Sequence, residues 1–344
     1  MKILVIGGTV FLGRHIVDAA LERGHEVTLF NRGQHNPDLF PKVEKIKGDR
    51  TVDLSPLRSR TWDAVIDTCG YVPRSVKKSC EALHDSVSLY VFISTLSVYA
   101  DMSRKNMDER SALAAIPDET VEQVTDVTGV TGVTGENYGA LKVLCEKEVL
   151  NAFPDRAFIP RPGLIVGPHD PTDRFTYWPA RISKQTRVLA PEPQDLGVMF
   201  IDVRDLSEWI ISMVERNQRG IYNADGPDYT LSMKEFLDAC VKVSSSNAEL
   251  LWVAAEFLLE RDVQPWEGLP LWLPGDDGAG MSSFNIRKAL GEGLKFRPLE
   301  RTIADTLEWH SKRPSSTVLR AGISLEREEE LLEEWTRLHP QVKT

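Results

Sequence analysis

Short apolar runs alternate with amphipathic stretches through the first 170 residues of the chain. Strands alternating with helices indicate parallel βαβ units, with helices on both faces of one sheet. Continuous apolar strands fit a sheet buried on both faces, so the pattern predicts an α/β fold with a doubly wound parallel sheet. The apolar runs predict strands at 3–6, 26–30, 43–47, 64–67, 89–94 and 156–160, and the periodic stretches predict helices at 11–23, 72–83 and 138–151.

The pattern loosens after residue 170. Prolines and tryptophans become frequent, and the stretch LPLWLPGDDGAG has the composition of an exposed, turn-rich loop. We therefore expect a doubly wound domain over residues 1–170, and a smaller region over residues 171–344 whose strands and helices return to the core. Residues 325–338 predict an acidic amphipathic helix docked through its leucine and tryptophan side chains. The three VTG triplets at 127–135 predict a flexible loop.

Composition narrows the class of protein. A net charge of -10 argues against binding to a nucleic-acid backbone. The four cysteines lie far apart, without a Cys-x-x-Cys pair, which makes a zinc ribbon or a disulfide framework unexpected. No apolar run is long enough for a membrane span, so we expect a cytoplasmic protein. We expect no metal site: His169, Asp170 and Asp173 have turn-residue spacing that matches no standard ligand set.

Three glycines, Gly7, Gly8 and Gly13, separate the first predicted strand from the first helix. Glycines at this point let the backbone turn tightly and approach a pyrophosphate, whose charge the free N–H groups of the helix N-terminus attract. The strand–loop–helix context predicts a Rossmann-type dinucleotide site that also includes Thr9, Phe11 and Leu12.

The end of the second predicted strand bears on the choice of cofactor. An acidic residue there would bind the ribose 2′-OH of NAD, whereas an arginine accommodates the 2′-phosphate of NADP. The chain has Asn31 and Arg32 at this point and no acid, which favours NADP, with NAD as the alternative. Asp49, after the third strand, is placed to contact the adenine amino group.

A Tyr-x-x-x-Lys element, Tyr138 to Lys142, opens the helix predicted at 138–151. Residues four apart share one helical face, so the ammonium can lie beside the phenol and favour its ionised form. The preceding stretch FISTLSVYA ends a strand and carries Ser94, Thr95 and Ser97. Doubly wound folds place their sites at the carboxyl ends of parallel strands, so these hydroxyl groups are candidates for the same site.

The glycine loop, STLSVYA and Tyr-Gly-Ala-Leu-Lys together resemble the extended or atypical short-chain dehydrogenase/reductase superfamily, and most of all its epimerase/dehydratase branch. The stretches RPGLIVGP, FIDVRDL and FRPLERTIADTLEWH extend the resemblance to about residue 310. Within the superfamily the chain is most similar to an atypical subgroup near the chloroplast stem-loop-binding proteins.

The resemblance implies a role for each matched position. Tyr138 would be the general acid/base, Lys142 would lower its pKa and hold the nicotinamide ribose, and Thr95 would hydrogen-bond the reacting oxygen, with Ser94 as the alternative. We expect further cofactor contacts from Cys69, Gly70, Ser94, Pro162 and Gly163. We expect Ser97, Leu164, Arg174 and Trp178 on the substrate side, the last two because they follow the cofactor region in the chain.

Three departures from the family's pattern bear on the substrate. Val10 stands where the loop usually has glycine, and a long insertion separates Thr95 from Tyr138. Leu164 and Val198 stand where relatives that act on nucleotide sugars place diphosphate-binding Asn and Arg.

These departures favour an NAD(P)-dependent oxidoreductase acting on a small carbonyl or alcohol, with a homodimer as one expected assembly. A nucleotide-sugar epimerase/dehydratase is the alternative. A non-catalytic NAD(P)-sensing or RNA-binding member is a second alternative, which the intact Thr/Tyr/Lys set and the negative charge disfavour.

Overall fold

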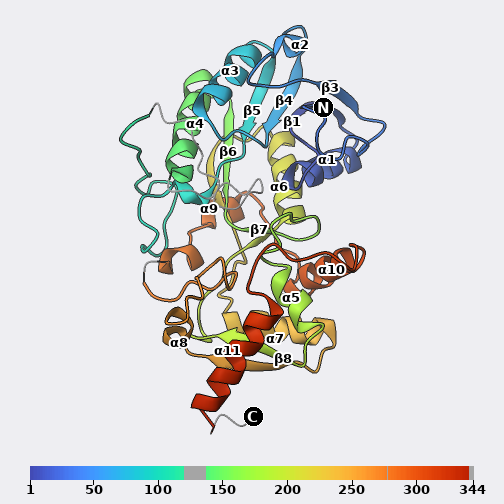
Figure 1. Ribbon diagram of the computed structural model, residues 1–344. Helices are drawn as coiled ribbons and strands as arrows, with labels where there is room; N and C mark the ends of the chain where they lie inside the picture. The colour runs from blue at the N-terminus through green and yellow to red at the C-terminus, as the bar shows by residue number, and fades with distance from the viewer. Residues whose placement is uncertain (120–136, 277, 341–344) are drawn as a thin grey trace.

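The computed structural model describes residues 1–119, 137–276 and 278–340, so the predicted loop at 127–135 lies outside the described residues. A seven-stranded sheet forms the upper part of the molecule (Figure 1), in the order β10-β6-β5-β4-β1-β2-β3. All of its paired neighbours are parallel. The doubly wound prediction is therefore confirmed. Its strands are β1 (Lys2–Ile6), β2 (Glu26–Asn31), β3 (Glu44–Lys47), β4 (Trp62–Asp67), β5 (Val87–Phe92), β6 (Ala157–Pro162) and β10 (Gly220–Ala224).

Alternate residues of the strands enter two separate cores. In β1, Ile3 and Val5 join a cluster with α1 (Leu12–Glu22) and α6 (Val203–Glu215). Leu4 and Ile6 join the opposite cluster, with α3 (Pro73–Leu83) and α4 (Tyr138–Ala152). A sheet covered on both faces explains why its central strands are apolar at successive positions, since neither face meets water. The short helix α2 (Ser55–Arg58) precedes β4.

The lower part of the molecule has a core of its own, rich in aromatic side chains that include Trp178, Phe236 and Trp272. It contains α5 (Tyr177–Ile182), β8 (Arg187–Pro191), α7 (Met233–Ser244), β11 (Glu249–Val253), α8 (Ala255–Leu259), α10 (Leu299–Ser311) and α11 (Leu325–Leu338). The remaining short elements are η1 (Leu96–Val98), β7 (Ile165–Val166), β9 (Ile201–Asp202), η2 (Ala279–Ser282) and α9 (Arg287–Gly291). Of these, η1 packs against α4 and α9 packs against β10. Because α6 packs on the large sheet and β10 is one of its strands, the chain crosses between the two parts more than once.

The acidic helix α11 docks as its pattern predicts, with Leu331 and Leu332 buried. One of its acids is also buried: Glu328 accepts hydrogen bonds from Arg181 and from the Leu189 backbone N–H, each at 2.8 Å. No helix among the described residues is both long and apolar enough to span a membrane.

Candidate active site

A cleft of about 740 Å³ lies where the carboxyl ends of β1, β2, β4, β5 and β6 meet the lower part of the molecule. The fold brings most of the residues singled out in the sequence to this one cleft. Gly70 and Trp178 are not among its lining residues. The predicted residues that line it are Gly7, Gly8, Thr9, Phe11, Leu12, Gly13, Asn31, Arg32, Asp49, Cys69, Ser94, Thr95, Ser97, Tyr138, Lys142, Pro162, Gly163, Leu164 and Arg174.

The glycine loop has the geometry of an anion site. Gly7 and Gly8 have φ angles of 107° and 91°, which residues with a Cβ rarely adopt. A Cβ on Gly13 would lie 2.8 Å from the Gly8 backbone nitrogen, so the loop packs tightly on the first turn of α1. No side chain caps this helix. Its N-terminal N–H groups thus face the cleft without a side-chain acceptor, which fits the pyrophosphate of a dinucleotide.

Asn31, at the end of β2, holds the glycine loop in place, whereas Arg32 faces the cleft. The Asn31 amide donates to the Gly7 carbonyl at 2.8 Å and accepts from the Gly33 N–H at 2.9 Å, so it fixes the glycine loop. Arg32 is exposed at the cleft and forms no ion pair within the described part of the chain. Asp49 accepts from the N–H and the hydroxyl of Thr51, which orients its carboxylate at the cleft rim.

Arg50 is a cleft residue that the sequence analysis missed. Its guanidinium donates to both oxygens of the buried Asp67 at 2.7 Å and to the Ser79 hydroxyl at 2.9 Å. Burial opposes ionisation of Asp67, but the Arg50 charge prevails and the pKa of the carboxyl is lowered. Burial raises the pKa of the neighbouring Cys69 thiol, so Cys69 is neutral at physiological pH.

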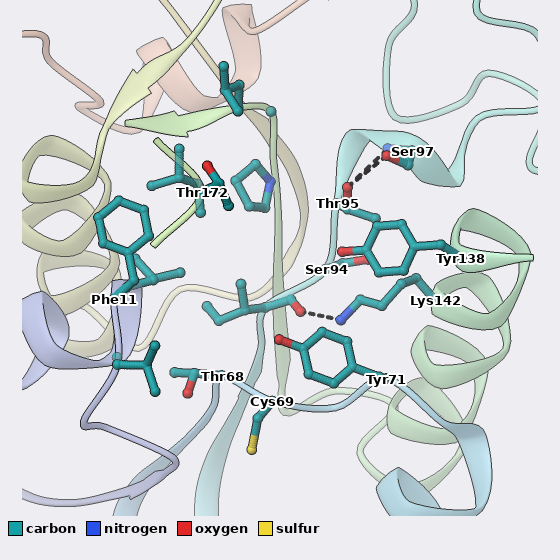
Figure 2. Close-up of a pocket in the computed structure, with 18 of the residues that line it drawn as sticks. Phe11, Thr68, Cys69, Tyr71, Ser94, Thr95, Ser97, Tyr138, Lys142 and Thr172 are labelled. Atoms are coloured by element: carbon teal, nitrogen blue, oxygen red, sulfur yellow. Dashed lines mark hydrogen bonds between the residues drawn. The ribbon is translucent and has the colours of Figure 1, made fainter. Parts of the chain in front are cut away.

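Tyr138 and Thr95 lie next to each other on one side of the cleft, across from Phe11 (Figure 2). Tyr138 begins α4, and Thr95 follows β5, so the fold sets the phenol and the hydroxyl side by side. Burial raises the pKa of Tyr138 to about 12, against a smaller lowering by its hydrogen bond to Thr95. Thr95 also donates to the Ser97 hydroxyl at 3.2 Å. The phenol is therefore protonated at neutral pH and can donate a proton.

Lys142 is buried at the strand ends, one helical turn after Tyr138 on α4. Its ammonium donates to the Gly70 carbonyl at 2.8 Å and the Ile93 carbonyl at 2.6 Å, and it lies 4.1 Å from the centre of the Phe92 ring. Burial lowers the pKa of Lys142. The two carbonyls hold the ammonium at the strand ends, and the expected lowering of the phenol's pKa by Lys142 stays a prediction.

Ser94 belongs to a buried polar network behind the site. Its hydroxyl donates to Glu146, whose carboxylate also accepts from Arg161 Nε at 2.9 Å and Nη2 at 2.6 Å. Arg161 donates further to the Tyr99 hydroxyl at 3.2 Å, and Tyr99 donates to Asn223. This engagement leaves Thr95 better placed than Ser94 to meet a reacting oxygen.

The prediction that Trp178 lies on the substrate side is wrong, because this residue does not line the cleft. Its indole is fully buried in the lower core and donates to the Pro270 carbonyl at 2.7 Å. Asp173, which precedes α5, is buried in an ion pair with Arg313 at 2.6 Å. Aromatic residues at this point of the chain build the core because α5 packs against α7.

Arg174, Leu164 and Val198 line the cleft, together with two buried acids, Asp170 and Asp225, that the sequence analysis did not place in the site. Asp170 had the spacing of a turn residue, and its carboxylate does accept from the N–H and hydroxyl of Thr172. Asp225 directly follows β10. A Cβ on Gly163 would lie 2.0 Å from Asp225 Oδ2. That close approach explains the glycine at position 163.

The family comparison matches the chain over residues 3–225, to the NAD dependent epimerase/dehydratase family. Among curated proteins, the chain is 33% identical over 114 residues to the chloroplast stem-loop binding protein of 41 kDa b from Arabidopsis thaliana. That match spans 28% of this chain and 30% of the length of the relative.

Solved structures share the fold across nearly the whole chain. UDP-glucuronic acid 4-epimerase from Bacillus cereus, in complex with NAD, has a TM-score of 0.66 and 16% identity, covering 93% of this chain and 100% of that one. The enzyme WbmG from Bordetella bronchiseptica, in complex with NAD and UDP, has a TM-score of 0.65 and 17% identity, covering 91% and 95%. The matched residues run from the glycine loop through Thr95, Tyr138 and Lys142 to the end of β10, so the chain belongs to the NAD dependent epimerase/dehydratase family and is an enzyme that uses a nicotinamide dinucleotide.

Proposed function

We propose that this chain oxidises and re-reduces a secondary alcohol of a sugar-like substrate, as an epimerase or dehydratase does. The observation that carries the proposal is the Thr95–Tyr138 pair, set at the strand ends of a cleft that continues past the dinucleotide site into the lower part of the molecule. Membership of the family and the structural similarity to UDP-sugar epimerases support it.

The chain's own groups perform proton transfer and positioning. A bound nicotinamide dinucleotide would supply a reversible hydride acceptor, with the pyrophosphate on the α1 N-terminus and the nicotinamide end near Lys142. Thr95 donates a hydrogen bond to the reacting oxygen. Tyr138 exchanges the proton of that oxygen, accepting it as the alcohol becomes a carbonyl and returning it when the carbonyl is reduced.

Burial sets the direction of the proton equilibrium. A phenol with a pKa of about 12 is almost wholly protonated at neutral pH, so it has a proton to donate, but the phenolate that would accept one is scarce. The oxidation step therefore needs a stabilising positive charge close to the phenolate. Lys142 lies one helical turn away on α4, and a shift of its ammonium from the Gly70 and Ile93 carbonyls would supply this charge.

A reductase of small carbonyl compounds is the second candidate, and a specific observation favours it. The cleft wall beyond the nicotinamide end is largely apolar and carries Leu164 and Val198. Among the described residues that line this half, Arg174 is the one cation, whereas a diphosphate in a low-dielectric site needs several donors or charges.

Product analysis separates the two candidates. The purified protein is incubated with NAD⁺ or NADP⁺ and, in turn, UDP-glucose, UDP-glucuronic acid, dTDP-glucose and GDP-mannose, with products resolved by chromatography and mass spectrometry. An isomer or a dehydrated product without net formation of reduced cofactor supports the proposal. Net consumption of NAD(P)H with simple ketones and no conversion of any nucleotide sugar contradicts it and supports the reductase.

A further inference from the structure

Asp170 is a buried acid at the cleft, and one of its two carboxylate oxygens forms no hydrogen bond within the described residues. The side chain is 2% exposed and lines the cleft. Oδ1 accepts from the Thr172 N–H at 2.8 Å and the Thr172 hydroxyl at 2.7 Å. Oδ2 is shielded from solvent and has no hydrogen-bond partner among the described residues. A buried carboxylate oxygen without a hydrogen bond costs free energy of folding. A ligand that donates a hydrogen bond to Oδ2 would recover this cost.

Arg174 follows Asp170 in the same loop before α5, but it does not donate a hydrogen bond to Oδ2. It influences Asp170 through its charge but forms no ion pair with an acid in the described part of the chain. Its guanidinium lies 5.7 Å from the centre of the Trp266 ring, and both residues line the cleft. The adjacent acid, Asp173, is taken by Arg313. Arg174 thus presents N–H donors to the cleft beside an acceptor that lacks one.

The pair lies near the reacting groups. The charge of Arg174 acts on the Tyr138 phenol, and Asp170 and Arg174 line the same cleft as Thr95 and Tyr138. Burial raises the pKa of Asp170 to about 6, so at pH 7.5 the carboxyl is ionised and accepts hydrogen bonds only. A ligand group that satisfies both residues must donate to a carboxylate and accept from a guanidinium. A hydroxyl group does both.

We propose that Asp170 and Arg174 together bind a second hydroxyl group of the substrate, close to the alcohol that Thr95 and Tyr138 hold. Asp170 is then a specificity-determining residue that selects polyhydroxylated substrates over simple alcohols. The inference deepens the proposed function and rests on it, because it assigns the unpaired acceptor to a sugar-like diol. It also gives the substrate side a polar anchor that does not require a diphosphate.

Matched alcohols test the proposal. Cyclohexane-1,2-diol and cyclohexanol differ by one hydroxyl, and their oxidation is followed by the formation of NAD(P)H. We expect the wild-type protein to prefer the diol by about 10- to 100-fold in kcat/KM, the value of a hydrogen bond to a charged group. Asp170→Asn should reduce the preference to within about threefold, and Asp170→Ser serves as a second variant if the amide disturbs folding.

Asp238→Asn is the matched control, since Asp238 lies exposed on α7 and pairs with Lys234 away from the cleft. This control should retain the diol preference. Equal use of both alcohols by the wild-type protein, or a preference that survives in both Asp170 variants, overturns the inference.

A binding measurement tests the diol site independently of the proposed function, because it requires no turnover. Saturation-transfer NMR of both alcohols, with NADP⁺ present, measures the preference without turnover. If no nucleotide sugar is converted to an isomer or a dehydrated product, but the diol binds preferentially and Asp170→Asn removes that preference, the proposed function fails and the diol site stands. If turnover occurs without any diol preference, the diol site fails alone.

Discussion

Glu146→Gln should destabilise the protein strongly, because it strips the counter-charge from a buried arginine. Arg161 and Glu146 are 1% and 2% exposed, and the guanidinium donates twice to the carboxylate. Glutamine matches glutamate in shape, but its amide NH₂ would turn donors toward the donors of Arg161 or Ser94. The variant keeps the volume and removes the charge, so the expected loss is electrostatic.

The magnitude follows from the burial of the pair. Removing one partner of a buried ion pair costs about 3–5 kcal/mol, since the other charge stays desolvated and uncompensated. That is a large part of the roughly 5–15 kcal/mol by which folded proteins are usually stable. At about 2 °C per kcal/mol for a large chain, the melting temperature should fall by roughly 6–10 °C.

Urea unfolding and thermal melting of Glu146→Gln measure the loss directly. The double variant Glu146→Leu/Arg161→Met replaces both charges with apolar groups, and it should be less destabilised than the two single changes added together. A loss below about 1 kcal/mol for Glu146→Gln would refute the reasoning, because the charge of Arg161 would then be balanced by groups other than Glu146, such as the Tyr99 hydroxyl.

Three further predictions concern the cleft. Tyr138→Phe should lower kcat by about 10²–10⁴-fold while calorimetry shows unchanged cofactor affinity, because the phenol moves a proton and does not anchor the cofactor; retention of most activity would contradict the assignment. NADP⁺ should bind about tenfold or more tightly than NAD⁺, and Arg32→Ala should abolish the difference, since a hydrogen bond to the 2′-phosphate contributes about 1.5–3 kcal/mol; equal affinities in the wild-type protein would sink this prediction. Gly13→Ala should weaken cofactor binding and lower stability by about 1–3 kcal/mol, because its Cβ would meet the Gly8 backbone at 2.8 Å; a stable variant with normal affinity would show that the loop can yield.

The sheet was predictable from sequence because its signal is local. Apolar strands, a glycine loop and helices of regular period each lie within one short window, so β1 to β6 and α1, α3 and α4 are found within a few residues of their predicted bounds. The strand β10, with the sequence GIYNA, escaped specific prediction because its Asn223 is satisfied by distant groups, among them Tyr99 and the Met107 carbonyl. Sequence patterns do not record such partners.

The candidate site was predictable in its residue types and not in its contacts. Tyr138 and Lys142 share a helical face as their spacing requires, yet the ammonium of Lys142 is held by two backbone carbonyls that no spacing rule reveals. Trp178 failed as a cleft residue because proximity in the chain does not say which face of α5 is buried. The spacing of Asp170 predicts a turn residue, and its turn contacts with Thr172 are present. That its second oxygen is buried without a partner can be seen only in the structure.

That unpaired oxygen adds to the stability of the protein a dependence on pH that Asp170→Asn should remove. Burial raises the pKa of Asp170 from its usual 3.8 to about 6, against the smaller lowering by Thr172. The folded protein therefore holds the proton more tightly than the unfolded chain, and the stability that this proton contributes is fully present below about pH 3.8 and lost as pH rises through 6. The change in pKa corresponds to about 3 kcal/mol. Asparagine does not titrate, so the free energy of unfolding of Asp170→Asn minus that of the wild type should grow by about 2.5 kcal/mol between pH 4 and pH 8, whatever its constant offset. Urea titrations across this range, with Asp238→Asn as the flat control, provide the measurement. A difference that stays constant with pH would show that Oδ2 is already satisfied in the folded protein, and the reason for assigning it to a substrate hydroxyl would be gone.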